Sequence, residues 1–168
     1  MTNQRRFCTP LAKARNLLGY GALMVRSLDG WFSNSRERCL NRSLIGYPRN
    51  HNYRLYRRRM LPSFRLYERE KAVTALYPKT METFLDIGCC RGYFVLEAAG
   101  RPHCRVAAGI DVHQPFVSTC VQVGRHMGIP NVRFYLADVD DVWREPERYG
   151  GPFQVVVMLG TYHYLYWG

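Results

Sequence analysis

The stretch FLDIGCCRGYFVLEAA, residues 84–99, decides the fold of this chain. An apolar run ends at Asp86, Gly88 and Gly92 follow it, and a helical pattern begins directly after Gly92. Glycine permits a tight turn and close approach of the backbone to a ligand, and a helix N-terminus presents free N–H groups to an anion. The stretch therefore predicts a buried strand, a ligand-binding turn and a helix.

The same alternation continues to the end of the chain. Short apolar runs stand at 83–87, 106–112, 132–138 and 153–159. Helical patterns stand between them at about 92–100, 115–127 and 140–149. Near-continuous apolar strands separated by helices are typical of a parallel sheet that is buried on both faces. The sequence thus predicts an α/β fold over its second half, preceded by a helix over roughly residues 64–77.

The glycine spacing D-x-G-x-x-x-G differs from the dinucleotide fingerprint, which needs a third glycine. It resembles the first motif of class I S-adenosylmethionine-dependent methyltransferases, D/E-x-G-x-G-x-G, with Cys90 in place of the middle glycine. A positive φ at Cys90 would cost about 1 kcal/mol. The resemblance implies a Rossmann-like methyltransferase fold with strand order 3-2-1-4, S-adenosylmethionine as cofactor, and methyl transfer as the reaction.

The resemblance also implies roles for the residues at the strand ends. Asp111, 25 residues beyond Asp86, would accept hydrogen bonds from both ribose hydroxyls, since a carboxylate has two acceptor oxygens. Asp138 would contact the adenine amino group, and the exit of the fourth strand would face the methyl acceptor. The cofactor-binding residues so implied are Asp86, Gly88, Cys89, Cys90, Gly92, Asp111, Val112, Asp138 and Leu159.

Each of these roles has a structural alternative. The two glycines could serve only a strand-to-helix turn. Asp111 could cap the helix that begins near Gln114, and any of Asp138, Asp140 and Asp141 could cap the next one. The paired cysteines are expected to line the methionine pocket rather than to react, because methyl transfer needs no protein thiol.

The methyl acceptor is less well defined by the sequence. His163 is the candidate general base beyond the fourth strand, with loop packing in an aromatic run as its alternative. The acceptor is left open between a small molecule and RNA. The six cysteines contain no CxxC pair, so no metal site is predicted. The thiols are expected to be reduced, which favours a cytoplasmic location.

The resemblance covers residues 83–168, and the sequence ends at Gly168, before the family's fifth to seventh strands. We therefore expect residues 64–168 to be an incomplete methyltransferase domain. An unpaired strand at 153–159 would then favour self-association. A catalytically impaired cofactor-binding fragment or pseudoenzyme that serves a partner is the alternative function.

Residues 1–63 are expected to be a basic, partly helical extension rich in Arg and Tyr, with a helical apolar pattern over 11–25. Residues 1–72 hold 16 basic and 4 acidic side chains, whereas residues 73–168 hold 8 and 9. In YRLYRRRM, residues 53–60, Tyr and Arg interleave, as on surfaces that bind single-stranded nucleic acid. The alternative is a helix face that covers a domain edge. The nucleic-acid interpretation implies an anionic partner, and it makes an RNA-binding accessory protein the third candidate function. No apolar stretch reaches the length of a membrane span.

Overall fold

A four-stranded parallel sheet forms the centre of the protein in the computed structural model, which describes residues 34–161. Its strands are β3 (Thr83–Ile87), β4 (Val106–Asp111), β5 (Val132–Leu136) and β6 (Val155–Val157). They lie in the order β5-β4-β3-β6, which confirms the 3-2-1-4 order predicted above. β3 is paired on both sides, with Leu85 opposite Ala108 on β4 and Val156 on β6. Because the strands are parallel, their carboxyl ends meet at one edge of the sheet.

The fourth strand is shorter than the predicted run 153–159. β6 pairs with β3 only from Phe84 to Asp86. Gln154, which precedes β6, donates its N–H to the Thr83 carbonyl. Within the described sheet β6 is an edge strand, and 53% of Val156 is exposed. Self-association through this strand remains a prediction.

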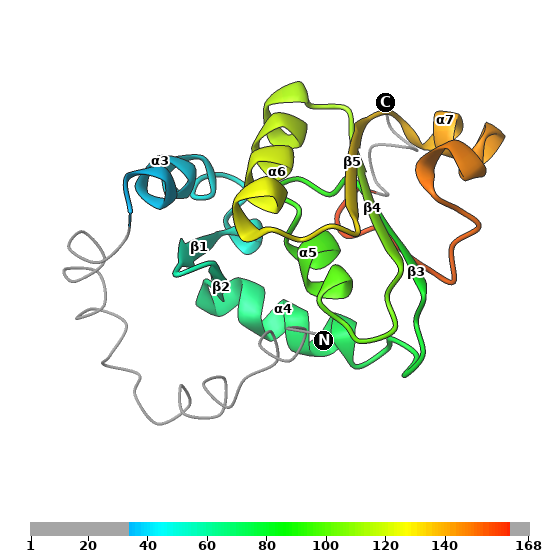
Figure 1. Cartoon of the computed structure of the whole chain (residues 1–168), viewed down its shortest axis with the longest axis horizontal. Helices are drawn as coiled ribbons and strands as arrows, with labels where there is room; N and C mark the ends of the chain where they lie inside the picture. Colours follow the sequence, from blue (N-terminus) through cyan, green and yellow to red (C-terminus); the bar gives the residue numbers. More distant parts are fainter. Residues whose placement is uncertain (1–33, 162–168) are drawn as a thin grey trace.

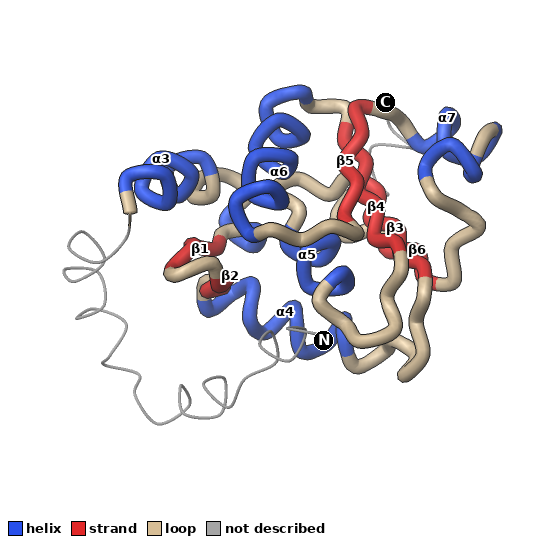
Figure 2. Tube along the Cα trace, viewed as in Figure 1, coloured by secondary structure: helices blue, strands red, loops and turns tan. Residues whose placement is uncertain are grey.

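Helices cover the two faces of the sheet unequally (Figures 1 and 2). α5 (Tyr93–Ala99) and α6 (Gln114–Met127) pack on one face, and α7 (Val139–Arg144) with the 3-10 helix η3 (Pro146–Tyr149) packs on the other. The first two confirm predicted helices. The third prediction, 140–149, is divided into two elements because a helix rarely continues into a proline such as Pro146.

Residues 34–62 pack against the same core as the sheet. They form α3 (Ser35–Ser43), the 3-10 helix η2 (Arg49–His51), and the antiparallel strands β1 (Tyr53–Tyr56) and β2 (Arg59–Pro62). α4 (Phe64–Thr74) follows, with Ser63 as its N-cap. Leu44 and Leu55 lie in the core cluster that also contains the buried faces of α5 and α6. The apolar pattern at 11–25 lies outside the described residues.

The segment YRLYRRRM is a β-hairpin and not a helix, so the helix-face interpretation of it is wrong. Tyr53 and Leu55 are 1% exposed and alternate with more exposed residues, which is the period of a strand. Arg57 and Arg58 occupy the turn with φ values of 49° and 56°. Two positive φ values are typical of the two-residue turn whose twist suits a hairpin.

Buried Glu37 holds this hairpin in place. Its carboxylate accepts hydrogen bonds from the Arg58 N–H (2.9 Å), the Arg57 N–H (3.3 Å) and His126 Nε2 on α6 (3.1 Å). Burial alone would raise the pKa of Glu37, but these hydrogen bonds outweigh it and hold the pKa below its ordinary value. One side chain on α3 thus joins the hairpin turn to a helix of the sheet domain.

The turn between β3 and α5 requires left-handed backbone at three positions. Gly88, Cys90 and Gly92 have φ values of 72°, 50° and 71°, so Cys90 adopts a conformation that favours glycine. A Cβ on Gly92 would lie 2.8 Å from Phe134 Cε1 and 2.9 Å from Cys120 Sγ. The second glycine of the motif is therefore needed for packing of the turn against β5 and α6.

Replacing Glu37 tests the link between the hairpin and α6. We expect Glu37→Ala to lower the free energy of unfolding by about 2–4 kcal/mol, because two N–H groups and an imidazole lose their acceptor. The exposed Glu68→Ala, whose nearest cation is Lys71 at 3.5 Å, should cost less than about 0.5 kcal/mol. Urea denaturation of both variants measures the difference, and equal losses would contradict the role given to Glu37.

A pair of glycine variants separates strain from packing. Gly128 has a φ of 68° and no atom within 4 Å of an added Cβ, so Gly128→Ala should show only the strain of about 1–2 kcal/mol. Gly92→Ala should cost about 1–3 kcal/mol more, because the methyl group also overpacks the contact with Phe134 and Cys120. Thermal unfolding of the two variants gives the comparison, and similar losses would show that the packing is not tight.

Candidate functional site

The carboxyl ends of β3 and β4 are joined through backbone hydrogen bonds of the turn. The N–H groups of Gly88 and Cys89 both donate to the Ile110 carbonyl at 2.9 Å, and the Gly92 N–H donates to the Cys89 carbonyl at 2.8 Å. Strand ends at such an edge are where ligands bind in open α/β sheets. The turn is thereby fixed against β4 rather than left as a loop.

Asp111 lies at the end of β4 and bridges two loops. Its Oδ2 accepts the Cys90 N–H at 2.8 Å, and its Oδ1 accepts the His113 N–H at 2.9 Å. The side chain is half-buried, and each carboxylate oxygen has a further lone pair. The structure thus gives Asp111 a loop-positioning role together with capacity for two more donors. The N-cap of α6 is His113, which makes no side-chain capping bond.

Asp86 is a buried carboxyl group without a hydrogen bond from any described residue. It is 3% exposed at the end of β3. Burial raises the pKa of Asp86 to about 8; the Arg69 guanidinium opposes this shift, and the Asp111 carboxylate adds to it. At neutral pH most Asp86 side chains are therefore protonated, and a cation in contact with them would favour the charged form.

Arg69 lies near enough to Asp86 to act on its charge, and His51 lies beside Arg69; neither residue was predicted from the sequence. Arg69 Nη1 donates to His51 Nε2 at 3.0 Å, and Arg69 forms no ion pair within the described part of the chain. Burial, together with the charges of Arg69 and Arg91, lowers the pKa of His51 to about 4, so the imidazole is neutral and accepts from Arg69. The half-buried guanidinium thus keeps donors for an anionic group. Because the sequence contains many arginines, nothing in it indicates that Arg69 is partly buried.

Arg91, inside the glycine motif, fastens the N-terminal segment to the turn. It is 4% exposed, and its guanidinium donates to the carbonyls of Ser43 (3.1 Å), Tyr47 (3.0 Å) and Pro48 (3.4 Å). Its own carbonyl accepts the Tyr53 hydroxyl at 2.7 Å. Because carbonyl oxygens satisfy its buried donors, no carboxylate is required. Residues 43–53 are therefore held against the predicted ligand-binding turn.

The two cysteines of the motif are buried and unreactive in character. Cys89 and Cys90 are 1% and 5% exposed. Burial raises the pKa of the Cys90 thiol to about 12, with the Arg91 charge opposing it, so the thiol form prevails. The Cys120 thiol donates to the Cys90 carbonyl at 3.3 Å and further fixes the left-handed residue.

The other predicted positions are less closely gathered. Asp138 caps α7: its Oδ1 accepts the Asp141 N–H at 3.0 Å, as the structural alternative predicted. Val112 follows β4 and is 73% exposed. Leu136, which was not predicted, ends β5 and is 53% exposed. Leu159 packs against the core, and His163 lies outside the described residues.

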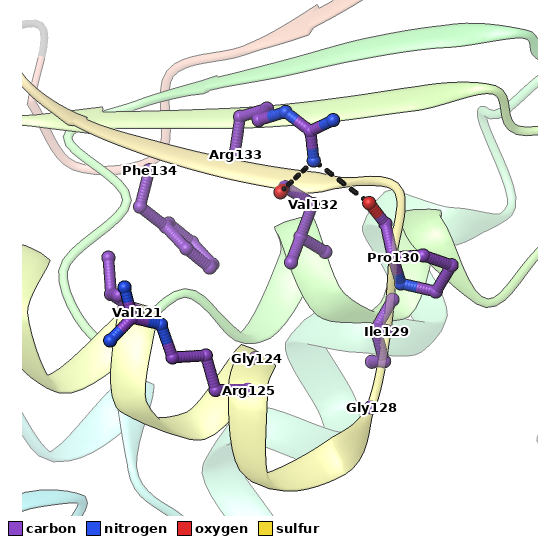
Figure 3. Close-up of a pocket in the computed structure, with 9 residues that line it drawn as sticks. All are labelled: Val121, Gly124, Arg125, Gly128, Ile129, Pro130, Val132, Arg133 and Phe134. Atoms are coloured by element: carbon purple, nitrogen blue, oxygen red, sulfur yellow. Dashed lines mark hydrogen bonds between the residues drawn. The ribbon is translucent and has the colours of Figure 1, made fainter.

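Two grooves of the described surface lie away from these strand ends. One, of about 560 Å³, lies between α6 and β5; Val132 and Phe134 point into it, while Arg133 turns away toward the Pro130 and Val132 carbonyls (Figure 3). The other is at the opposite edge of the sheet, beside Gln154. Among the described residues no three His, Cys, Asp or Glu side chains gather to hold a metal. None of the described helices is long and apolar enough to cross a bilayer.

Solved structures share this fold. WbdD in complex with the kinase inhibitor LY294002 and monomeric WbdD each have 22% identity and a TM-score of 0.51. The match covers 58% of this chain but only 23% and 24% of those chains, so this chain spans about a quarter of WbdD. A further WbdD structure is described as the bifunctional kinase-methyltransferase, at 21% identity. At this identity the likeness shows the fold alone.

The sequence comparison with known families gives a more specific result. No curated protein matches the chain. The methyltransferase domain family matches residues 84–167, which is half of the chain and begins within β3. The matched region contains the glycine turn, Asp111 and the four parallel strands described above. The chain belongs to the methyltransferase domain family, and its sheet is the Rossmann-like sheet of the class I enzymes.

Proposed function

We propose that this chain binds S-adenosylmethionine at the carboxyl ends of β3 and β4 and transfers its methyl group to an acceptor. The observation that carries the proposal is the Asp111 carboxylate, which fixes the glycine turn through Cys90 and keeps acceptor capacity on both oxygens. A ribose diol supplies two donors that match this capacity. Methyl transfer is the chemistry that the domain family supports.

The charged groups beside the turn suit the methionine end of the cofactor. Asp86 is buried without a hydrogen bond, and an ammonium group would supply the missing cation. Arg69 keeps donors for a carboxylate while the neutral His51 takes one of its N–H groups. A zwitterionic amino acid would thus pair with both groups at once, with its carboxylate on Arg69 and its ammonium group favouring the ionised form of Asp86.

The adenine end would meet a different surface. Val112 follows Asp111 in the chain, Leu136 lies opposite Asp111 on β5, and both apolar side chains are exposed. Asp138 has its Oδ2 left after capping α7. The complete proposed contact set is Asp86, Gly88, Cys89, Cys90, Gly92, Asp111, Val112, Asp138 and Leu159, with Arg69 and Leu136 added from the structure.

The bound cofactor would supply an electrophilic methyl group on a sulfonium, so the protein has to align the acceptor and remove its proton. His163 stays the proposed general base, and the acceptor a small molecule or RNA. A cytoplasmic location, in which thiols stay reduced, is part of the same proposal. Release of S-adenosylhomocysteine from S-adenosylmethionine distinguishes an enzyme from a module that only binds the cofactor.

Asp111→Ala tests the ribose contact. We expect it to weaken S-adenosylhomocysteine binding by about 1.5–3 kcal/mol, because hydrogen bonds to a charged group are lost. Asp140→Ala removes the same charge from an exposed position on α7 and should leave the affinity unchanged. Calorimetric titration of the full chain measures both. Unaltered affinity of a folded Asp111→Ala variant would refute the assignment.

The pH dependence of binding tests Asp86. An ammonium group prefers the ionised carboxylate, and in the free protein Asp86 ionises only near pH 8. Affinity for S-adenosylhomocysteine should therefore rise with pH, by about tenfold per unit from about pH 6 to about pH 7.5. Asp86→Asn should abolish this slope, and Asp140→Asn should keep it. A flat profile for the unmodified chain would contradict the ammonium contact.

A further inference from the structure

The arginines of residues 34–62 form a surface that neither the fold nor the proposed cofactor site explains. This part of the chain contains eight arginines and a single acid, Glu37. Seven of the eight arginines are exposed: Arg36, Arg38, Arg42, Arg49, Arg57, Arg58 and Arg59. We name the surface that these seven residues form on α3, η2 and the β1–β2 hairpin the arginine surface.

The one acid within residues 34–62, Glu37, is withdrawn into the interior. Glu37 is 2% exposed, and its carboxylate is occupied by the N–H groups of Arg57 and Arg58 and by His126. No described carboxylate lies within ion-pair distance of the guanidinium groups of Arg36, Arg42, Arg57, Arg58 or Arg59. The positive charge of these five residues is therefore open to an external anion.

The hairpin turn has arginines at two positions whose backbone conformation does not favour arginine. Both turn residues have positive φ, where Asn and Gly are favoured and Arg is not. The Glu37 carboxylate binds their backbone N–H groups, so the two side chains are directed outward and are exposed. The guanidinium of Arg57 lies 5.3 Å from the centre of the Tyr56 ring, which places an aromatic face beside the cations.

We propose that the arginine surface binds single-stranded nucleic acid. Guanidinium groups bind phosphates in a bidentate manner, and Arg and Tyr planes stack on bases, so both parts of the ligand have partners here. An anionic membrane fits less well, because the exposed large apolar side chains of this region, Ile45, Tyr47 and Phe64, lie in the chain beside α3 and the hairpin and not on them. This inference does not rest on the proposed methyl transfer, since binding needs neither cofactor nor turnover.

Fluorescence anisotropy of the full chain with a labelled single-stranded RNA of about 20 nucleotides tests the proposal over a range of salt concentrations. The variant Arg57→Gln, Arg58→Gln, Arg59→Gln should bind at least about tenfold more weakly at low salt. Its slope of log affinity against log salt should be smaller by about 2, since about 0.7 is lost per phosphate contact. A second variant on another element, Arg36→Gln with Arg42→Gln, should reduce the slope by about 1.

A matched control removes the same charge elsewhere. Lys79→Gln, Arg105→Gln, Arg144→Gln changes exposed residues before β3, before β4 and on α7, and should keep the affinity within about twofold. If this control weakens binding as much as the hairpin variant, the attraction is due to net charge and the proposal is overturned. Unchanged RNA affinity in both arginine-surface variants overturns it as well.

The nature of the partner is tested with two other polyanions at the same salt concentration. Polyglutamate and phosphatidylserine vesicles should bind more weakly than the RNA, because neither offers bases to stack. Equal or tighter binding to either one would assign the arginine surface to an acidic protein or to a membrane and would refute the nucleic-acid assignment. Single-stranded DNA of the same sequence shows whether the ribose hydroxyl contributes to the affinity.

Discussion

The left-handed turn between β3 and α5 is the constraint on which the rest of the structure depends. Gly88, Cys90 and Gly92 all have positive φ, and the turn is kept in this form by the Ile110 carbonyl and the Asp111 carboxylate. This geometry places the N-terminus of α5 at the edge of the sheet and directs Arg91 toward the segment before β1. The cofactor site and the attachment of the N-terminal part therefore follow from the same few hydrogen bonds.

The sheet was predictable because its information is local. The strands are near-continuous apolar runs interrupted by Gly and Asp, and β3 agrees residue by residue with the predicted run 83–87. The hairpin was not predictable in this way. In its sequence only Tyr53 and Leu55 alternate as core residues, and what fixes the turn is Glu37, 20 residues earlier, with His126 on α6 as its third partner. A side chain that acts over such a separation leaves no period in the sequence.

The site could be predicted only in part, because only some of its residues are marked by a local sequence pattern. Asp111 stands directly at the end of an apolar run, so its place at the sheet edge follows from the pattern. Arg69 and Arg91 are two of 21 arginines, and no local signal separates the buried ones from the exposed ones. Tertiary structure decides this: Arg91 is buried because three carbonyl oxygens of the preceding segment satisfy its donors. Asp138 is the opposite case: its capping hydrogen bond joins residues three apart, so its role as a helix cap could be predicted from the sequence.

Burial of charge also couples the stability of the fold to the character of its surface. A carboxylate in contact with solvent would neutralise neighbouring arginines and would contribute little to stability. The Glu37 carboxylate instead accepts hydrogen bonds from backbone N–H groups and an imidazole inside the protein, where a hydrogen-bonded charge contributes more to stability. The same burial removes the only acid of residues 34–62 from the surface. The interaction that holds the hairpin on the domain is thus also the one that leaves no acid on the exposed surface of residues 34–62.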